Sequence, residues 1–299
     1  TYTYDAASAS YYQNGRLTKI ADGSGFTANF HEARGNVKRQ HRKIGAFTHA
    51  IIYTYNAADQ ITQINYPSGR IVYFTRNSLG QITQVTTRAT AGATLFTVAS
   101  GIAWKPMSGL LSSLTHGNGL VTGASYDLDY RLTGLNVMDG GTPLSILSYG
   151  YGDGLNLTAV NDNVVSANSA ALGYTPANRL ATANGPWGNA SYSYDSVGNR
   201  LNHIVTQGGT TTTRLASHGG ANNRITGMTE NGAALRTYTH DGNGNILTDT
   251  RPGEVFAFTY NVRNRPTSVT RNSVAYATYV YNGLEQLVSR STSAPGGPS

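Results

Sequence analysis

The 299-residue sequence contains no cysteine. Disulfide bonds, thiolate metal sites and a cysteine nucleophile are therefore excluded. Charged residues are also scarce, at 12% of the chain against an average of about 25% in soluble domains. So few charges argue against a fold made of long surface helices, which carry many Glu and Lys residues.

Long apolar runs are missing as well. No stretch approaches the ~20 consecutive apolar residues of a membrane-spanning helix, and no apolar core of a signal peptide is seen. We therefore expect no membrane span. The sequence opens with TYTYD, inside a motif described below and without methionine, so we expect a fragment or a processed product.

Glycine, tyrosine, threonine, asparagine and serine are abundant instead. The chain has 35 glycines, well above the average of about 7%, and 20 tyrosines. These residue types favour β-strands and tight turns, whereas the usual helix formers are underused. The composition therefore predicts an all-β fold with many short strands and few or no helices.

A repeat runs through almost the whole sequence. One clear copy is YSYDSVGNRL at residues 192–201, and aligning the others on Gly198 gives a modal period of 20 to 21 residues. We call the aligned position the repeat position. It is held thirteen times, by Gly15, Gly35, Asp59, Gly80, Gly109, Tyr130, Leu155, Asn178, Gly198, Asn223, Gly244, Asn264 and Glu285.

Each repeat is best explained as one β-hairpin, because its length is twice the usual spacing of short strands. Tyr192 and Tyr194 share a strand face, and Asp195 can start a turn by accepting backbone N–H groups two residues on. Gly198 supplies the positive φ that most residues avoid. The four copies with Asp59, Tyr130, Leu155 and Glu285 at the repeat position fit this less well, so we expect different turns there.

Apolar residues recur two and five positions after the repeat position, as Ile61 and Ile64 do. In a regular strand these positions face opposite sides. Either a β-bulge shifts the alternation, or both faces of the sheet are partly covered. In the Gly198 copy, Leu201 and Ile204 are assigned to these positions with one extra residue. Pro266 is expected at a strand start or edge, because it cannot donate to the ladder.

The chain resembles the YD-repeat or Rhs-repeat family, whose signature is similar to YxYDxxGxLxxI. The closest copies are YSYDSVGNRLNHI (192–204), YDLDYRLTGL (126–135), YTHDGNGNIL (238–247) and YVYNGLEQLVS (279–289), and LTHGNGL (114–120) looks like an element between repeats. The resemblance implies a repetitive antiparallel hairpin strip wound into a large barrel or open hollow shell. In Rhs toxins, insecticidal toxin complexes and teneurins such shells occur, and in the bacterial relatives they enclose a toxic domain.

The resemblance covers residues 1–290, which we expect to form one β-shell domain of about thirteen hairpins, followed by a flexible tail at 291–299. It implies a secreted or cell-surface bacterial protein with a non-enzymatic, structural function as a shell segment. An effector domain supplied by a larger chain is the expected partner. The autoprotease segment and toxin that follow the repeats in Rhs proteins are not seen in this sequence. The alternative is a surface adhesion module that binds carbohydrate or a polyanion, and the oligomeric state is left open.

The net charge is +7 and the pI about 9.5, which invites a nucleic-acid interpretation. Many cations, however, are single arginines just after a turn, so no specific nucleic-acid partner is expected. One basic segment, RGNVKRQHRK at 34–43, stands apart. It is either an anion-binding site or a solvated strand face. Its candidate residues are Arg34, Lys38, Arg39, Arg42 and Lys43.

No cofactor, metal or catalytic site is predicted. The seven histidines lack metal-ligand spacing, and His31 and His240 are interpreted as strand positions. DGNGN at 241–245 resembles the start of a calcium loop, but Ile246 and Pro252 stand where such a loop needs Gly and Glu, so a repeat turn is expected. Serine elbows are absent, and Trp104 and Trp187 lie outside the repeat pattern.

Overall fold

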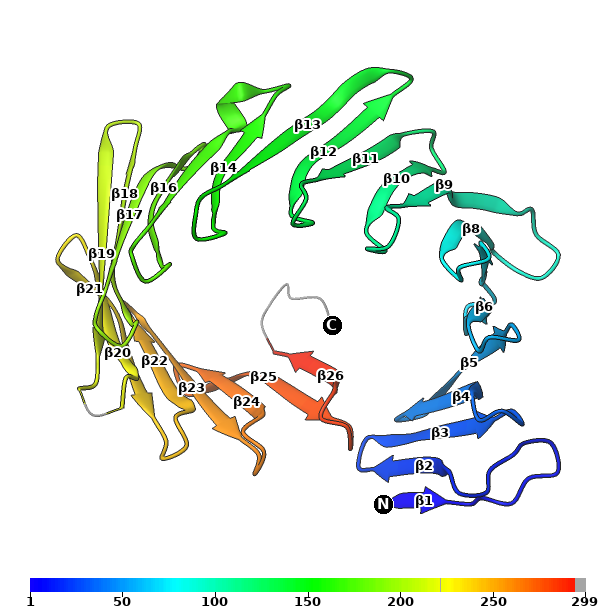
Figure 1. Ribbon diagram of the computed structural model, residues 1–299. Helices are drawn as coiled ribbons and strands as arrows, with labels where there is room; N and C mark the ends of the chain where they lie inside the picture. The colour runs from blue at the N-terminus through cyan, green and yellow to red at the C-terminus, as the bar shows by residue number, and fades with distance from the viewer. Residues whose placement is uncertain (221, 294–299) are drawn as a thin grey trace. The chain divides into compact units, whose positions relative to one another are not determined.

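The computed structural model describes residues 1–220 and 222–293. Within these ranges the chain forms 26 β-strands in one antiparallel sheet, and the helical content is a single 3₁₀ turn, η1 at Ser166–Asn168 (Figure 1). The predicted all-β class and the antiparallel hairpin strip are confirmed. Of the predicted tail, residues 291 and 292 belong to the last strand, and 294–299 lie outside the described residues.

Contacts divide the chain into two compact units. The first comprises residues 1–147 and 281–288. In it, sequence neighbours pair as antiparallel strands, as in Figure 1 from blue to cyan. Its strands are β1 (Tyr2–Tyr4), β2 (Leu17–Asp22), β3 (Gly25–His31), β4 (Val37–Ile44), β5 (Phe47–Tyr55), β6 (Ile61–Asn65), β7 (Ile71–Arg76), β8 (Ile82–Arg88), β9 (Phe96–Trp104), β10 (Leu111–His116), β11 (Val121–Tyr126), β12 (Leu132–Asp139) and the start of β13 (Thr142–Tyr151).

The second unit comprises residues 148–280 and those from 289 onward. Its strands follow the same scheme, each paired with its sequence neighbour from β14 through to β25. They are the end of β13, β14 (Leu157–Asp162), β15 (Ala170–Tyr174), β16 (Leu180–Gly185), β17 (Gly188–Tyr194), β18 (Arg200–Gln207), β19 (Thr210–His218), β20 (Ile225–Glu230), β21 (Ala233–His240), β22 (Ile246–Arg251), β23 (Glu254–Tyr260), β24 (Pro266–Arg271), β25 (Val274–Tyr281) and part of β26 (Leu287–Thr292).

Every one of the thirteen repeat positions has a positive φ and lies in the turn of a hairpin. This includes the four for which the sequence predicted different turns: Asp59 at 59°, Tyr130 at 63°, Leu155 at 62° and Glu285 at 61°. That expectation was wrong, because the same two backbone hydrogen bonds close these turns; in one, Asn56 N donates to Gln60 O and Asp59 N to Asn56 O. The turn geometry therefore overrides the residue's own preference.

A β-bulge follows the repeat turns and explains why apolar residues recur two and five positions after the repeat position. In β6, Ile61 pairs with Tyr55 and Gln63 with Thr54, so Thr62 is left as the extra residue. The same shift occurs in other hairpins of both units. The bulge brings the second and fifth positions after the repeat position onto one face.

Two further predictions concern residues that follow a repeat turn. In the Gly198 copy the second position is Arg200, which pairs with Tyr194, and Leu201 is the bulged residue, so the assignment of Leu201 as the second apolar position was wrong. Pro266 is the first residue of β24, as predicted.

The sheet has little interior. The accessible surface is 17707 Å², whereas a compact 31.8 kDa monomer would expose about 12200 Å². Most strand residues are half-buried, and no large side chain among the described residues is fully enclosed. Stability must therefore come from contacts between neighbouring hairpins, as in other repeat proteins.

We call the edge that carries the thirteen repeat turns the repeat edge. The opposite edge, where each hairpin leads into the next, is called the return edge. Its turns vary in length, from two residues at Gly208–Gly209 to the segment that contains η1. The return edge thus lacks the regular spacing of the repeat edge.

Candidate functional site

The most regular polar chemistry of the molecule lies in the repeat turns. In one of them, Asp195 Oδ1 accepts the backbone N–H groups of Val197, Gly198 and Asn199 at 2.8 to 3.1 Å. Burial alone would raise the pKa of Asp195, but the Asn199 amide and these backbone donors lower it overall. The predicted role of this aspartate as a turn initiator is confirmed.

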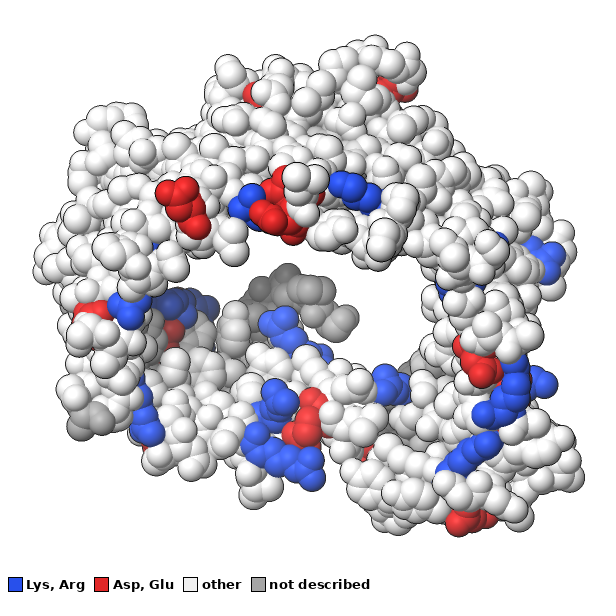
Figure 2. Space-filling view, in the orientation of Figure 1, with Lys and Arg blue, Asp and Glu red and all other residues white. Residues whose placement is uncertain are grey.

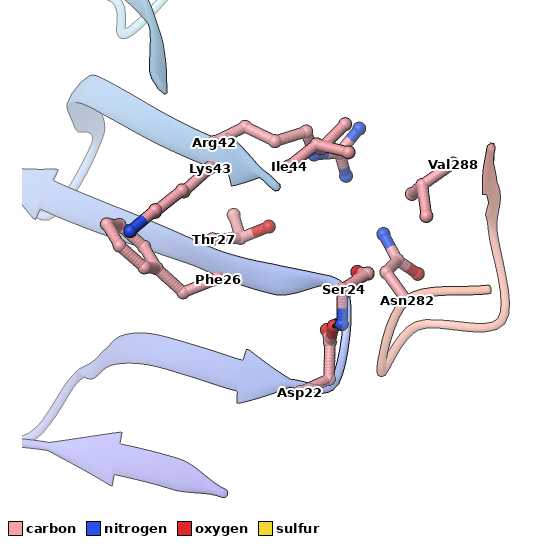
Figure 3. Close-up of a pocket in the computed structure, with 9 residues that line it drawn as sticks. All are labelled: Asp22, Ser24, Phe26, Thr27, Arg42, Lys43, Ile44, Asn282 and Val288. Atoms are coloured by element: carbon pink, nitrogen blue, oxygen red, sulfur yellow. Dashed lines mark hydrogen bonds between the residues drawn. The ribbon is translucent and has the colours of Figure 1, made fainter. Parts of the chain in front are cut away.

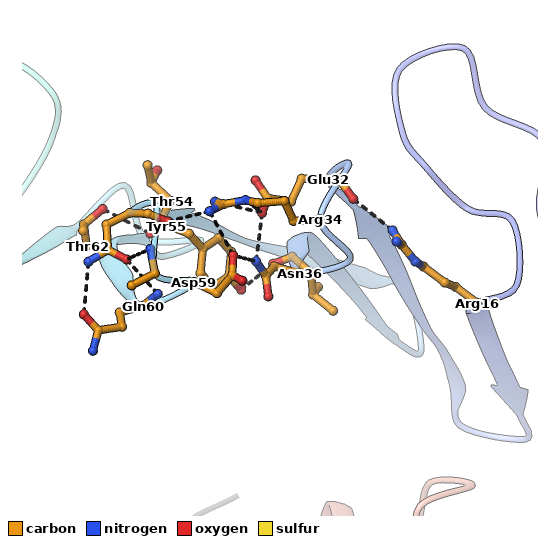
Figure 4. A network of polar contacts seen from close by, with 12 residues as sticks. Arg16, Glu32, Arg34, Asn36, Thr54, Tyr55, Asp59, Gln60 and Thr62 are labelled. Carbon is orange, nitrogen blue, oxygen red and sulfur yellow. Dashed lines mark hydrogen bonds and ion pairs between the residues drawn. The ribbon is translucent and has the colours of Figure 1, made fainter. Parts of the chain in front are cut away.

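Side chains also connect many repeat turns to the next one, and Figure 4 shows the first of these connections. Asn36 Nδ2 donates to Asp59 Oδ1 at 2.7 Å, and Arg16 Nη1 donates to the Glu32 carbonyl at 2.9 Å. Gln60 reaches the Gly80 carbonyl at 3.4 Å. These bonds run along the repeat edge, across the junctions between hairpins.

A second set of ties lies one step into the sheet. The tyrosine four residues before a repeat position donates its hydroxyl to the backbone carbonyl two residues after the previous one, at 2.8 to 2.9 Å. The donors are Tyr55, Tyr126, Tyr174, Tyr194 and Tyr260, with acceptors Val37, Leu111, Leu157, Leu180 and Ile246. Burial raises the pKa of the Tyr55 and Tyr260 hydroxyls, which keeps them protonated as donors.

Two other residue types make the same tie, and sequence reasoning missed both. Arg76 donates to the Ile61 carbonyl at 3.2 Å, and Trp104 Nε1 donates to the Ile82 carbonyl at 2.7 Å. Trp104 was placed outside the repeat pattern because it stands five residues before Gly109. That turn is one residue longer, with Gly109 N bonded to Lys105 O, which brings Trp104 into the tyrosine position.

The five basic residues proposed as an anion site do not converge. Arg34 lies in a repeat turn and forms ion pairs with Glu32 at 3.2 Å and Asp59 at 3.0 Å. Lys38 is the bulged residue of β4, because Val37 pairs with His31 and Arg39 with Phe30. These two cations therefore have separate surroundings.

The remaining three divide between the two faces of β4. Arg39 and Lys43 lie on one face, opposite Phe30 and Phe26 of β3, whereas Arg42 lies on the other and donates to Gln286 Oε1 at 2.5 Å. Arg39 and Lys43 are therefore the two candidates that share a strand face. The predicted anion site stays a prediction.

His41 lies between these two cations on the same face. Burial, followed by the nearby charge of Arg39, lowers the pKa of His41, so the imidazole is neutral at neutral pH and adds no charge there. In the view of Figure 2, basic and acidic side chains are interspersed and most of the surface carries neither. This distribution does not resemble the continuous basic face of a nucleic-acid-binding protein.

Residues 281–288 contact the β2–β3 hairpin within the first unit (Figure 3). Gly283 N donates to Asp22 Oδ2 at 2.7 Å, and Ser24 donates to the other oxygen of the same carboxylate through its amide at 2.8 Å and its hydroxyl. Burial alone would raise the pKa of Asp22, but these hydrogen bonds together lower it. The notch that Asn282 and Val288 complete leaves no room for a bound molecule.

A larger hollow lies beside the loop that joins β1 to β2. It has a volume of about 340 Å³ and is lined by Ser8, Tyr11, Tyr12, Gln13, Asn14, Arg16 and Ala33. Tyr11 packs against Phe30 with ring centroids 4.9 Å apart, and Tyr12 is exposed. This loop contains the repeat position Gly15 and is longer than the other repeat turns.

The other residues considered as possible sites in the sequence lie at strand ends or in repeat turns. His31 ends β3, where its Nδ1 lies 2.9 Å from Gln13 Oε1, and His240 ends β21. Asp241 Oδ1 accepts the Asn245 amide at 2.8 Å in a repeat turn of the predicted kind. Across residues 1–220 and 222–293, no group of three or more potential metal-ligating side chains occurs.

The arrangement of hairpins, turns and ties can be compared with known proteins. Neither a family model nor a curated protein matches the sequence. Solved structures do match. The chain shares the fold of part of the Tc toxin chains.

The Photorhabdus luminescens Tc holotoxin pore, in a TccC3 mutant form, superposes with a TM-score of 0.77 and 17% identity over 92% of this chain. A crystal structure of TcdB2-TccC3-TEV matches with a TM-score of 0.76 and 18% identity over 91%. One of TcdB2-TccC3 without its hypervariable C-terminal region gives 0.67 and 14% over 87%. In each case this chain spans 16% of the Tc chain.

In the described part of the molecule no helix is long and apolar enough to cross a membrane.

Proposed function

We propose that the chain is a YD- or Rhs-type wall segment: a non-enzymatic strip of hairpins within a larger secreted or surface bacterial protein. In that protein the strip would wind with further hairpins into a shell around an effector domain. The observation that carries the proposal is the match of more than nine tenths of this chain to TcdB2-TccC3 and Tc holotoxin structures.

The architecture supports a wall rather than a compact binding domain. The sheet is one layer thick and exposes about 17707 Å². Tyrosine hydroxyls and turn side chains hold each hairpin to the next, so the strip is stable without a second layer. A wall of one layer can separate two volumes with few residues.

A structural role also accounts for the carboxylates that recur in the repeats. Asp127, Asp195 and Asp241 occupy equivalent positions, and each accepts N–H groups of its own turn. A catalytic group is normally unique, whereas these three serve the same purpose in three different hairpins. We therefore propose that the chain has no catalytic activity of its own.

The test is to isolate the natural gene product that contains this chain and examine it by cryo-electron microscopy and limited proteolysis. A wall segment should be found lining a cavity, with a second domain inside that resists protease until the wall is unfolded. A gene product in which the strip encloses nothing, or in which every other domain is cleaved at once, would overturn the proposal.

The hollow beside the β1–β2 loop favours one second candidate, carbohydrate binding. Its tyrosine rings, amides and arginine are the groups that stack on and hydrogen-bond to sugars. A glycan array with the purified chain, repeated with Tyr12→Ala, tests this. A signal lost in the variant supports a saccharide site; a chain that binds no glycan, or a variant that binds equally, excludes it.

A further inference from the structure

Four junctions on the repeat edge join an asparagine to an amide or carboxylate. In each, the asparagine directly after one repeat position donates Nδ2 to the Oδ1 of the next repeat position. The pairs are Asn36 with Asp59 at 2.7 Å, Asn156 with Asn178 at 2.9 Å, Asn199 with Asn223 at 3.3 Å and Asn245 with Asn264 at 2.8 Å. The acceptor residue has a φ of 56 to 59° in all four.

Four other junctions place a longer side chain against a glycine. The residue after one repeat position is then Arg16, Arg179, Arg224 or Gln60, and the next repeat position is Gly35, Gly198, Gly244 or Gly80, respectively. The arginines donate Nη1 to a carbonyl of that next turn: Glu32, Asp195 or Asp241, at 2.6 to 2.9 Å. Each guanidinium therefore lies across the following turn.

The glycine leaves room for the longer side chain, which approaches the space that a β carbon would enter. A β carbon on Gly198 would lie 3.2 Å from Arg179 Nη2, and one on Gly80 would lie 2.2 Å from Gln60 Nε2. The further atoms of an asparagine would have to displace the guanidinium. These arginine-facing glycines also have φ values of 94 to 104°, beyond those of the Asn and Asp turns.

The two kinds of junction alternate within two stretches of the chain. From Asn156 to Asn264 the order is asparagine, arginine, asparagine, arginine, asparagine over five successive junctions. From Arg16 to Gly80 it is arginine, asparagine, glutamine. If the hairpins of either stretch paired one hairpin out of register, a long side chain would face an Asn or Asp turn and an asparagine would face a glycine turn. A shift by two hairpins would keep each side chain opposite a turn of the matching kind.

We propose that at these eight junctions the two positions form a recognition pair through which a hairpin selects the hairpin beside it. There, a hairpin that presents Arg or Gln accepts a glycine turn, and one that presents Asn accepts an Asn or Asp turn; Arg131 and Arg265, which precede the Leu155 and Glu285 turns, lie outside both kinds. The recognition surface is the repeat edge and its partner is a hairpin of the complementary kind, so the structural unit of these two stretches is a pair of hairpins. This inference does not depend on what the strip encloses.

The test exchanges one kind of junction for the other. Gly198→Asn places an asparagine against Arg179, and the double variant Arg179→Asn with Gly198→Asn rebuilds an asparagine junction. The control is Gly119→Asn, because the turn at 116–120 has the same two backbone hydrogen bonds and a φ of 90°, with nothing within 4 Å of an added β carbon. It reports the cost of asparagine in such a turn without an arginine.

We expect Gly198→Asn to lower the thermal midpoint by about 3 to 5 °C more than Gly119→Asn does. The double variant should recover to within about 2 °C of the control, although Arg179→Asn alone removes a bond. Additive losses in the double variant, or equal losses for Gly198→Asn and Gly119→Asn, would overturn the proposal.

A reciprocal exchange keeps the test decisive if Gly198→Asn does not fold. Asn245→Arg presents an arginine to Asn264, and adding Asn264→Gly provides the matching glycine. The double variant should be more stable than Asn245→Arg alone, and hydrogen exchange in the 261–265 turn should slow again. If Asn264→Gly only adds to the loss, the pairs do not recognise each other.

Discussion

The two edges of the strip are held together by different means. On the repeat edge, side chains cross the junctions: amides, guanidinium groups and tyrosine hydroxyls donate to the neighbouring hairpin. On the return edge, the backbone itself makes the connection, as when Gly45 N donates to Ser24 O and Gly117 N to Val98 O. On the first edge the bonds depend on residue identity, whereas on the second main chains approach closely and a few side chains add bonds.

Asparagine shows the difference within one residue type. On the repeat edge Asn199 uses its side chain to reach Asn223. On the return edge Asn272 N donates to Val255 O at 2.8 Å while its Oδ1 accepts Val255 N at 2.7 Å, so the residue substitutes for a strand partner. Asn231 does the same with Thr213. In residues 1–220 and 222–293, the side-chain bonds of the repeat edge recur at the regular spacing of the repeat.

The largest effect is expected where backbones approach on the return edge. A β carbon on Gly25 would lie 2.1 Å from the Lys43 carbonyl oxygen, so Gly25→Ala must push two strands apart. We expect a loss of about 3 kcal/mol or more in the free energy of unfolding, measured with denaturant. Gly253→Ala is the control, because its φ is 77° and nothing lies within 4 Å; it should cost about 1 to 2 kcal/mol. Equal losses would show that φ alone matters.

The next effect concerns the tyrosine ties of the repeat edge. Tyr194→Phe removes the hydroxyl that donates to the Leu180 carbonyl at 2.9 Å and leaves that half-buried acceptor unpaired. The expected loss is about 1 kcal/mol. Tyr192→Phe, two residues away on the same strand, should change the free energy of unfolding much less, because its ring stacks on His203 and is retained. A similar loss in both would contradict the role of the hydroxyl.

The sequence predicted the repeat edge well because each turn requires specific local chemistry. An Asp or Asn three residues before the repeat position occurs in seven copies and a glycine or asparagine at it in nine, and the period of about 21 residues located the other turns. Tyr130 and Leu155 were misjudged because backbone hydrogen bonds hold a positive φ against the residue's preference. Trp104 was misjudged because one added turn residue shifted its spacing.

The basic segment could not be interpreted from sequence for a related reason. The bulge at Lys38 changes which residues share a face, so Arg39 and Arg42 lie apart although the sequence clusters them. The close approach at Gly25 was also invisible, since it depends on the backbone of a strand about twenty residues away. Features that depend on register or on the backbone of another strand therefore cannot be predicted from local sequence patterns.

Acid should destabilise the strip in two pH ranges. Burial lowers the pKa of His31, His41 and His203, so their protonation costs stability as the pH falls below the ordinary value of 6.5. The pKa of Asp195 is lowered below 3.8; that carboxylate therefore stabilises the fold above this value and ceases to do so as the pH falls through the folded-state pKa. Unfolding free energies measured from about pH 7 to about pH 3 should decline in both windows.

Asp195→Asn separates the two windows, because Asn261 accepts the same backbone groups in its own turn without a charge. The variant should keep the decline caused by the histidines and lose part of the one below pH 3.8. An unchanged slope in the lower window would show that this carboxylate does not contribute to the acid response.

The smallest effect is expected at the bulges next to the repeat turns. Thr62 Oγ1 donates to the Thr54 carbonyl at 3.2 Å on an exposed surface, so Thr62→Val should cost less than about 0.5 kcal/mol. Leu247 already occupies an equivalent bulge, which shows that the hydroxyl is dispensable for the shape. Thr18→Val should cost more, about 1 kcal/mol, because Thr18 is only 3% exposed and its bond to the Thr3 carbonyl has no water to replace it. If both variants lost the same, burial would not set the value of these hydroxyls, and the bulge would be held by its backbone alone, as the return edge is.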